Sequence, residues 1–257
     1  MTDARVAACP VYVRPALGRW LSLDVRSGWI LLALFSVVRI GFVLQANVTR
    51  SYGLVSMFFV IMALTPLVLL SPPGRRRIGL NWRPRFRGLI TGMMLGASCC
   101  AAMLLTAHVL FGSGDDNAFV YIAGTYTGLP SAMSDTERLI FFGVFALIGM
   151  TFSPIGEELF YRGIIHECFA VRMGEWRAGC IDAAAFALVH LAHFGLVWRG
   201  AGFEFLPLPA LWWLCGMFMT ALVFNWSRRA SGSLIGAVAA HSSFNLLMTG
   251  WIFFVVV

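Results

Sequence analysis

Residues 139–171 read LIFFGVFALIGMTFSPIGEELFYRGIIHECFAV, and Glu157, Glu158 and Arg162 form a cluster of charged side chains inside this largely apolar stretch. Each ionisable side chain at the centre of a membrane helix costs about 2.5–3.5 kcal/mol on insertion scales, so such a cluster needs a partner or a function. In a helix, Glu158 and Arg162 share one face and are spaced for an ion pair, whereas Glu157 lies about 100° further round. We therefore predict that Glu158 and Arg162 pair, and that Glu157 is left free.

The composition predicts a membrane protein. The chain has 257 residues, of which 59% are hydrophobic and only 12% charged, and this excludes an ordinary soluble domain. We predict an all-α, polytopic transmembrane helix bundle with about seven helices, each long enough to cross a hydrocarbon core of about 30 Å. An interfacial, cytoplasmic segment of residues 1–27 would precede a single bundle of residues 28–257. The expected spans are residues 28–48, 52–71, 88–111, 139–170, 180–198, 207–226 and 232–256.

The arginines predict an orientation. All nineteen basic residues are arginine, which is typical of a GC-rich bacterial genome. With the N-terminus in the cytoplasm, fourteen arginines lie on that side and only Arg50, Arg138 and Arg199 on the other, as the positive-inside rule requires. We expect an integral protein of a bacterial inner (plasma) membrane. The net charge of +7 then indicates contact with anionic lipid headgroups, and no nucleic-acid partner is expected. No pattern predicts an oligomeric state.

Two other predicted helices carry polar residues at the depth of Glu157. His190 ends the sequence FALVH (residues 186–190), and His241 and Asn245 begin and end HSSFN (residues 241–245) on one helix face. Counted from the predicted cytoplasmic ends, Glu157, His190 and His241 all lie about 15–20 Å deep, at 1.5 Å per residue. Three helices can therefore bring these side chains to one level. This depth favours access from the cytoplasmic side.

These side-chain types suit hydrolysis. A carboxylate in an apolar bundle gains proton affinity and can take a proton from water, and a nearby histidine can orient that water. A histidine and an asparagine on one face can donate hydrogen bonds to a developing oxyanion. The alternatives are a buried ion pair in a non-proteolytic scaffold or binding protein, a proton relay in a proton-coupled carrier, and a zinc site of one glutamate and two histidines.

The other histidines and the cysteines give weaker signals. His193 lies one turn beyond His190, whereas His108 and His166 have no matching partners and are predicted to be structural. The zincin pattern His-Glu-x-x-His fails after His166-Glu167, because Ala170 stands where the second histidine is needed. The six cysteines show neither metal-ligand nor disulfide spacing and are expected to pack in the core.

Glu-Glu-x-x-x-Arg, Phe-x-x-x-His and His-x-x-x-Asn, in this order and in separate helices, resemble the CPBP family of intramembrane proteases. That family includes type II CAAX prenyl endopeptidases and bacterial Abi-type proteins. The resemblance covers about residues 139–250, and the first helices add no comparable signal. It implies a glutamic-type peptidase without a metal. Glu157 would activate water with help from His190, His241 and Asn245 would form an oxyanion hole, and Glu158 and Arg162 would support the site.

We therefore expect an intramembrane endopeptidase that needs no cofactor. Its partner would be a membrane-associated protein or peptide, cut near its C-terminus. Prenylated tails, leader peptides and C-terminal sorting tails all remain open as substrates.

Overall fold

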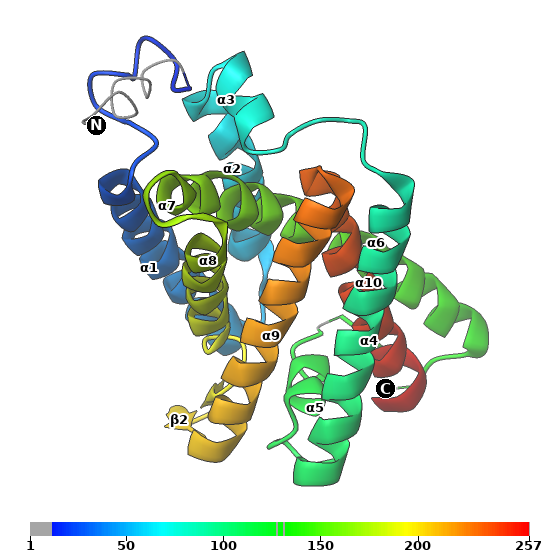
Figure 1. Cartoon of the computed structure of the whole chain (residues 1–257). Helices are drawn as coiled ribbons and strands as arrows, with labels where there is room; N and C mark the ends of the chain where they lie inside the picture. Colours follow the sequence, from blue (N-terminus) through cyan, green and yellow to red (C-terminus); the bar gives the residue numbers. More distant parts are fainter. Residues whose placement is uncertain (1–11, 127, 131, 257) are drawn as a thin grey trace.

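The computed structural model describes residues 12–126, 128–130 and 132–256, and these form a bundle of helices with one small hairpin of strands (Figure 1). The predicted all-α bundle is confirmed. Residues 1–11 of the expected interfacial segment lie outside the described residues. The elements are α1 (Val25–Thr49), α2 (Gly53–Leu69), α3 (Pro72–Arg77), α4 (Phe86–Phe111), α5 (Ala118–Ala123), α6 (Asp135–Glu157), the π-helix η2 (Glu158–Ile165), α7 (His166–Met173), α8 (Glu175–His190), β1 (Leu196–Trp198), β2 (Phe203–Phe205), α9 (Pro207–Ser231), α10 (Leu234–Trp251) and the π-helix η3 (Ile252–Val256).

Five helical segments among the described residues are long and apolar enough to cross a membrane. Two further segments that we expected to span are shorter: α2 has 17 residues and α8 has 16. The bundle is therefore polytopic, but the expected count of seven is not confirmed. The five segments are α1, α4, the continuous run Asp135–Met173, α9 and the run Leu234–Val256.

The predicted span 180–198 is wrong in its last eight residues. The helix α8 begins earlier, at Glu175, and ends at His190, after which the chain turns into strand β1. Gly195 adopts φ 108°, which a helix cannot contain, and the amide of Leu196 bonds back to the carbonyl of Leu191. The side chain of Asn47 on α1 donates to the carbonyl of Ala192 at 2.8 Å and so satisfies a carbonyl that the helix no longer uses.

The segment that carries the glutamates changes its helical type at the glutamates themselves. A capping box starts α6, in which Ser134 and Glu137 each bond the backbone of the other. Pro154 lies inside α6 and leaves out one backbone hydrogen bond of the helix, because it has no N–H to donate. From Glu158 to Ile165 the chain forms the wider π-helix η2, a type of turn that is frequent at functional sites. It continues into α7, which lies across the bundle in Figure 1.

Glycines allow α4 to approach its neighbours closely. Gly88, Gly92 and Gly96 repeat every four residues, so they lie on one face of α4, and all three are buried. A Cβ at Gly92 would lie 2.9 Å from the Cβ of Ser227 on α9, and a Cβ at Gly96 would overlap the carbonyl of Ala240 on α10. Small residues at this spacing are the usual means of close helix packing in membranes. They fix α4 against the helix that carries His241.

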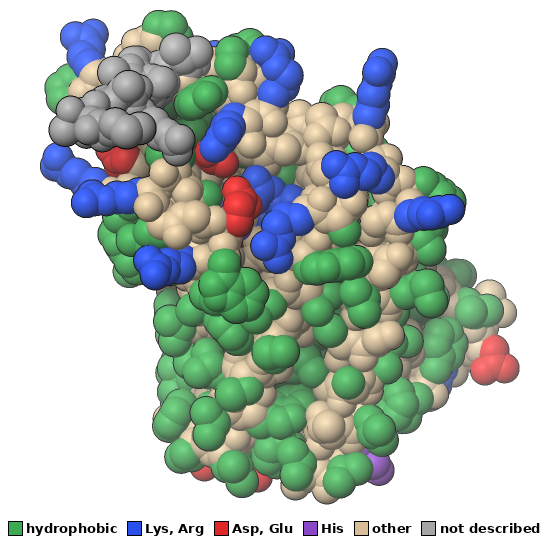
Figure 2. Space-filling model, in the orientation of Figure 1, with side chains coloured by type: hydrophobic (Ala, Val, Ile, Leu, Met, Phe, Trp, Pro, Cys, Tyr) green, Lys and Arg blue, Asp and Glu red, His purple; other side chains and the backbone are tan. Residues whose placement is uncertain are grey.

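The two ends of the bundle differ in charge. Much of the surface between the two ends and toward the arginine-poor end is apolar, with Leu147 exposed by 67% and Val109 by 72%, as expected for side chains that face lipid. Arginines gather at the end formed by α3, α7 and the end of α9 (Figure 2). We call this the arginine-rich end, and the end formed by the α1–α2 turn, α5 and the β1–β2 hairpin the arginine-poor end. At the arginine-rich end, Arg77 on α3 bonds Glu167 on α7 at 2.7 Å and so links these two helices.

We predict that Gly96→Val destabilises the protein by about 1–3 kcal/mol or more, because the added atoms collide with backbone and not with a movable side chain. The measurement is the thermal unfolding midpoint in detergent. The matched control is Gly41→Ala on α1, where a Cβ meets nothing within 4 Å. Equal midpoints for the two variants would contradict the close approach of α4 and α10.

Candidate active site

Glu157 has a cationic partner that the sequence did not predict. Its carboxylate forms an ion pair with Arg39, which comes from the middle of α1. Both side chains are buried, at 0% and 1% exposure, so the pair is shielded from water. Glu157 also accepts a hydrogen bond from Ser153 at 3.3 Å, one turn earlier on α6. The expectation that Glu157 is left free is therefore wrong, because an unpaired carboxylate would be too costly at this depth.

Glu158 contacts two side chains, Arg162 and His241. The sequence predicted the first of these contacts. Its Oε1 lies 3.1 Å from Nη1 of Arg162 and 2.8 Å from Nδ1 of His241. The other ring nitrogen of His241, Nε2, lies 3.7 Å from Oε2 of Glu157. His241 on α10 thus contacts both glutamates through its two nitrogens.

Arg162 is the most enclosed cation near the site. It is fully buried, its Nε lies 3.7 Å from Asp182 on α8, and its Nη2 donates to the carbonyl of Ala221 on α9 at 3.3 Å. Its guanidinium also lies over the rings of Phe186 and Phe224, at 4.3 and 5.4 Å from their centroids. The residue therefore ties η2 to α8 and α9 and compensates the charge of Glu158.

His190 reaches the site through Arg39. Its Nδ1 lies 2.6 Å from the carbonyl of Phe186, which can only accept, so this nitrogen carries the proton. The other nitrogen, Nε2, is then an acceptor and lies 3.3 Å from Nη2 of Arg39. Arg39 therefore stands between Glu157 and His190 and contacts both. His193 stacks on His190, with ring centroids 5.4 Å apart.

Asn245 lies one turn beyond His241 on α10 and is bonded to α6. Its amide donates to the carbonyl of Gly149 at 2.8 Å. An amide nitrogen carries two hydrogens, so this bond leaves one donor for another partner. Asn245 is 9% exposed and borders a cavity, as does His241.

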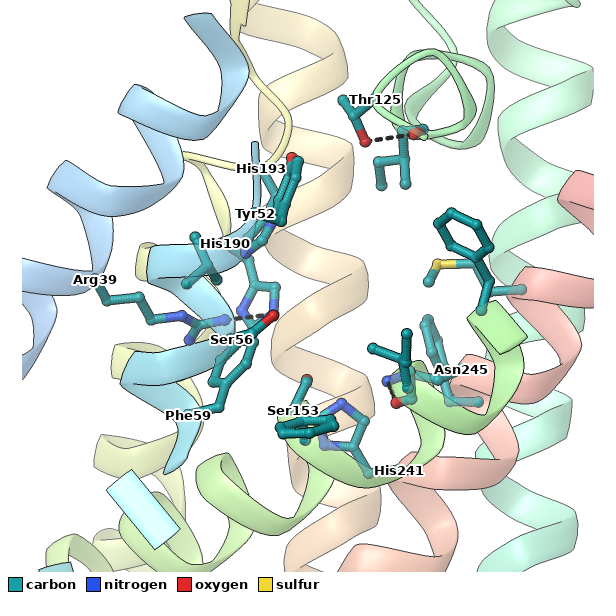
Figure 3. A pocket seen from close by; sticks show the side chains of 18 of the residues that line it. Arg39, Tyr52, Ser56, Phe59, Thr125, Ser153, His190, His193, His241 and Asn245 are labelled. Carbon is teal, nitrogen blue, oxygen red and sulfur yellow. Dashed lines mark hydrogen bonds between the residues drawn. The ribbon is translucent and has the colours of Figure 1, made fainter. Parts of the chain in front are cut away.

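This cavity has a volume of about 420 Å³ and is large enough for several side chains of a peptide. Figure 3 shows Arg39, His190, Ser153, His241 and Asn245 around it. Aromatic side chains form much of its wall. They include Phe59, Phe145, Phe152, Phe186, Phe224 and Phe244. Glu157 lies directly behind Ser153, His241 and Arg39, which all border the space.

The structure brings all six predicted site residues together, from three segments of the chain. Glu157, Glu158, Arg162 and His241 are in direct contact, His190 joins them through Arg39, and Asn245 borders the same cavity. Arg39 was missed because its partner lies far away in the sequence. The only signal was an arginine inside an apolar span, which by itself indicates that a buried acid must exist elsewhere.

The expectation that His166 has no partners is wrong. Its Nδ1 lies 2.7 Å from Asp182 and its Nε2 3.0 Å from Glu175. Asp182 also accepts from Asn225 at 2.6 Å. Burial raises the pKa of Glu175, but the hydrogen bond with His166 and the positive charges of His166, Arg228 and Arg229 together outweigh burial and hold that pKa below its usual value. This network extends from Arg162 toward the arginine-rich end and supports the site from behind.

A zinc site was one alternative for these residues. Among the residues that the structure describes, no three of His, Cys, Asp or Glu are grouped as they would be to hold a metal ion. The site has oxygen and nitrogen atoms that could ligate a metal. However, the carboxylate of Glu157 already pairs with Arg39, and that of Glu158 pairs with Arg162.

A comparison with known families gave one match, which covers part of the chain. Residues 139–247 match the family model described as Type II CAAX prenyl endopeptidase Rce1-like. This part of the chain belongs to the Rce1-like family. The match spans less than half of the chain, includes all six predicted site residues and excludes Arg39. Neither the curated proteins nor the solved structures gave a match. The Rce1-like region lies in a polytopic helix bundle, and the chain is an integral membrane protein.

We predict that Arg39→Met costs about 3–5 kcal/mol of stability, because Glu157 then stays buried without its cation. The measurement is again the thermal unfolding midpoint in detergent. The double variant Arg39→Met with Glu157→Gln should recover most of the loss, because it removes both charges. The exposed Arg26→Met serves as the control. A double variant as unstable as Arg39→Met alone would contradict the ion pair.

Proposed function

We propose that this protein is an intramembrane endopeptidase in which Glu157 activates the attacking water. The observation that carries the proposal is the contact of two buried glutamates with His241 at the inner end of a cavity that also holds His190 and Asn245. The Rce1-like match supports a peptidase that acts on membrane-associated proteins. The roles of single residues below are our assignment.

In the first step, a water between the cavity and Glu157 gives a proton to the carboxylate and attacks the peptide carbonyl carbon. Arg39 places a positive charge beside Glu157, and the carboxylate is the form of this side chain that accepts a proton. Nε2 of His190 can accept the second hydrogen of the water and so orient it, provided that Arg39 yields part of its contact with that nitrogen. The products of this step are a tetrahedral oxyanion and a protonated Glu157.

His241 and Asn245 are placed to stabilise the oxyanion. Asn245 has one amide hydrogen beyond the bond to Gly149. Nδ1 of His241 bonds the carboxyl group of Glu158. Nε2 can therefore donate to an oxyanion in two cases: both ring nitrogens carry a hydrogen, or the hydrogen in the bond between Nδ1 and Glu158 belongs to Glu158. The carboxylates of Glu157 and Glu158 lie on the two sides of the ring, so each ring nitrogen faces one of them.

In the second step, the C–N bond breaks and the protonated Glu157 gives its proton to the leaving amine. The carboxylate returns to its ionised form, with Arg39 as its partner. Arg162 holds Glu158 in place throughout, and Asp182 and Ala221 hold Arg162. These contacts keep the reacting groups in a fixed geometry, which is the main contribution that a folded site can make.

We predict that Glu157→Gln lowers cleavage by about 10²–10⁴-fold, the usual contribution of a general base. The readout is the set of C-terminal peptides in membranes that contain the native protein or the variant, determined by mass spectrometry. The exposed Asp135→Asn at the start of α6 is the control. Cleavage that survives Glu157→Gln would remove the proposed base. Transport that survives it, with no cleavage product found for the native protein, would favour a carrier.

We also propose that no metal takes part, because each glutamate is already compensated by an arginine. Cleavage should therefore persist in strong chelator, and the purified protein should contain less than one equivalent of zinc. Metal analysis and a chelator titration measure this. Loss of cleavage in chelator that added zinc restores would contradict the proposal.

A further inference from the structure

The cavity is closed toward the arginine-rich end. None of the described residues that border it comes from α3, α7 or the α9–α10 turn. Behind Glu157, the π-helix η2 is packed into the core, with Tyr161, Ile164 and Ile165 exposed by 1% or less. Ile78 and Leu234, which lie at that end next to Gly163, are buried to the same degree. A peptide chain has no path through this layer.

The cavity instead extends to the arginine-poor end. It is bordered by Arg50, Ser51 and Tyr52 in the turn between α1 and α2, and by Thr125 and Tyr126 after α5. Arg50 lies eleven residues beyond Arg39 along the chain, which is about 16 Å at 1.5 Å per residue. Figure 3 shows Thr125 at one end of the space and His241 at the other. This is the opposite side from the one that the depth of Glu157 suggested.

A second hollow adjoins the main cavity at the arginine-poor end, and we call this shared opening the mouth. The second hollow has a volume of about 320 Å³, is bordered by Arg50, Asp115, Tyr121 and Arg199 among others, and so shares Arg50 with the main cavity. Arg199 bonds Asp116 at 2.8 Å and Glu204 at 2.7 Å. The mouth is therefore polar and charged, while the wall nearer the glutamates is aromatic.

From these features, and resting on the proposed function, we propose that substrate enters from the arginine-poor end, which is the non-cytoplasmic side. The orientation follows from the positive-inside rule applied to the two ends. The occupant is the membrane-anchored segment of an exported protein or peptide, with its polar flank at the mouth and its apolar residues among the aromatic side chains. A prenylated tail at the cytoplasmic leaflet would instead meet the closed layer.

The test labels introduced cysteines in the native chain with a membrane-impermeant maleimide. Ser56→Cys places a thiol on α2 within the cavity, and Arg83→Cys places one at the arginine-rich end. We expect Ser56→Cys to react at least tenfold faster in right-side-out than in inside-out vesicles, and Arg83→Cys to show the reverse. The native protein, with its own cysteines, gives the background.

Two labelling results would overturn the proposal: reaction of Ser56→Cys only in inside-out vesicles, or no reaction of Ser56→Cys from either side. Labelling requires no catalysis, so it is independent of whether Glu157 acts as a base. If Ser56→Cys labels from outside but Glu157→Gln still cleaves, the access route stands and the proposed mechanism falls.

The substrate class has its own readout. The C-terminal peptides that disappear with Glu157→Gln should map to exported segments next to a membrane anchor. Modification of Ser56→Cys from outside should also lower the yield of these peptides at least tenfold relative to the same variant before labelling. Peptides that map to cytoplasmic tails would overturn the assignment.

Discussion

Two adjacent carboxylates, both fully buried, impose the main constraint on this bundle. A charge moved from water into an apolar interior costs several kcal/mol even after relaxation, and two like charges side by side cost more. Each glutamate therefore needs its own cation, Arg39 for Glu157 and Arg162 for Glu158, and His241 lies between them. Helices α1, α10 and η2 must all meet at this point for the charges to balance.

The π-helix makes this arrangement possible. Glu157 ends α6 and Glu158 begins η2, so the two neighbours lie where the helix widens. Glu157 reaches toward α1 and the cavity, whereas Glu158 reaches toward α10 and the core. The same transition follows a proline, which weakens the regular pattern of backbone bonds just before the site.

The sequence predicted what depends on local spacing. Glu158 with Arg162, and His241 with Asn245, are one helical turn apart, and depth along each helix placed His190 near them. It did not predict what depends on contacts between distant segments. The partner of Glu157 lies on α1, and the partners of His166 lie on α8. The side on which the cavity opens depends on which helix ends pack together, and the apolar run after His190 gave no sign of its turn at Gly195.

Arg39 lies outside the region that matches the Rce1-like family. The ion pair with Glu157 therefore crosses the boundary of the family region. A fragment cut to the matched region would carry Glu157 without its cation, so α1 belongs to the functional unit and is not a mere anchor. Any change in α1 that removes this arginine must be balanced by another cation near Glu157, so the sequence of the first helix constrains a site whose motifs all lie elsewhere.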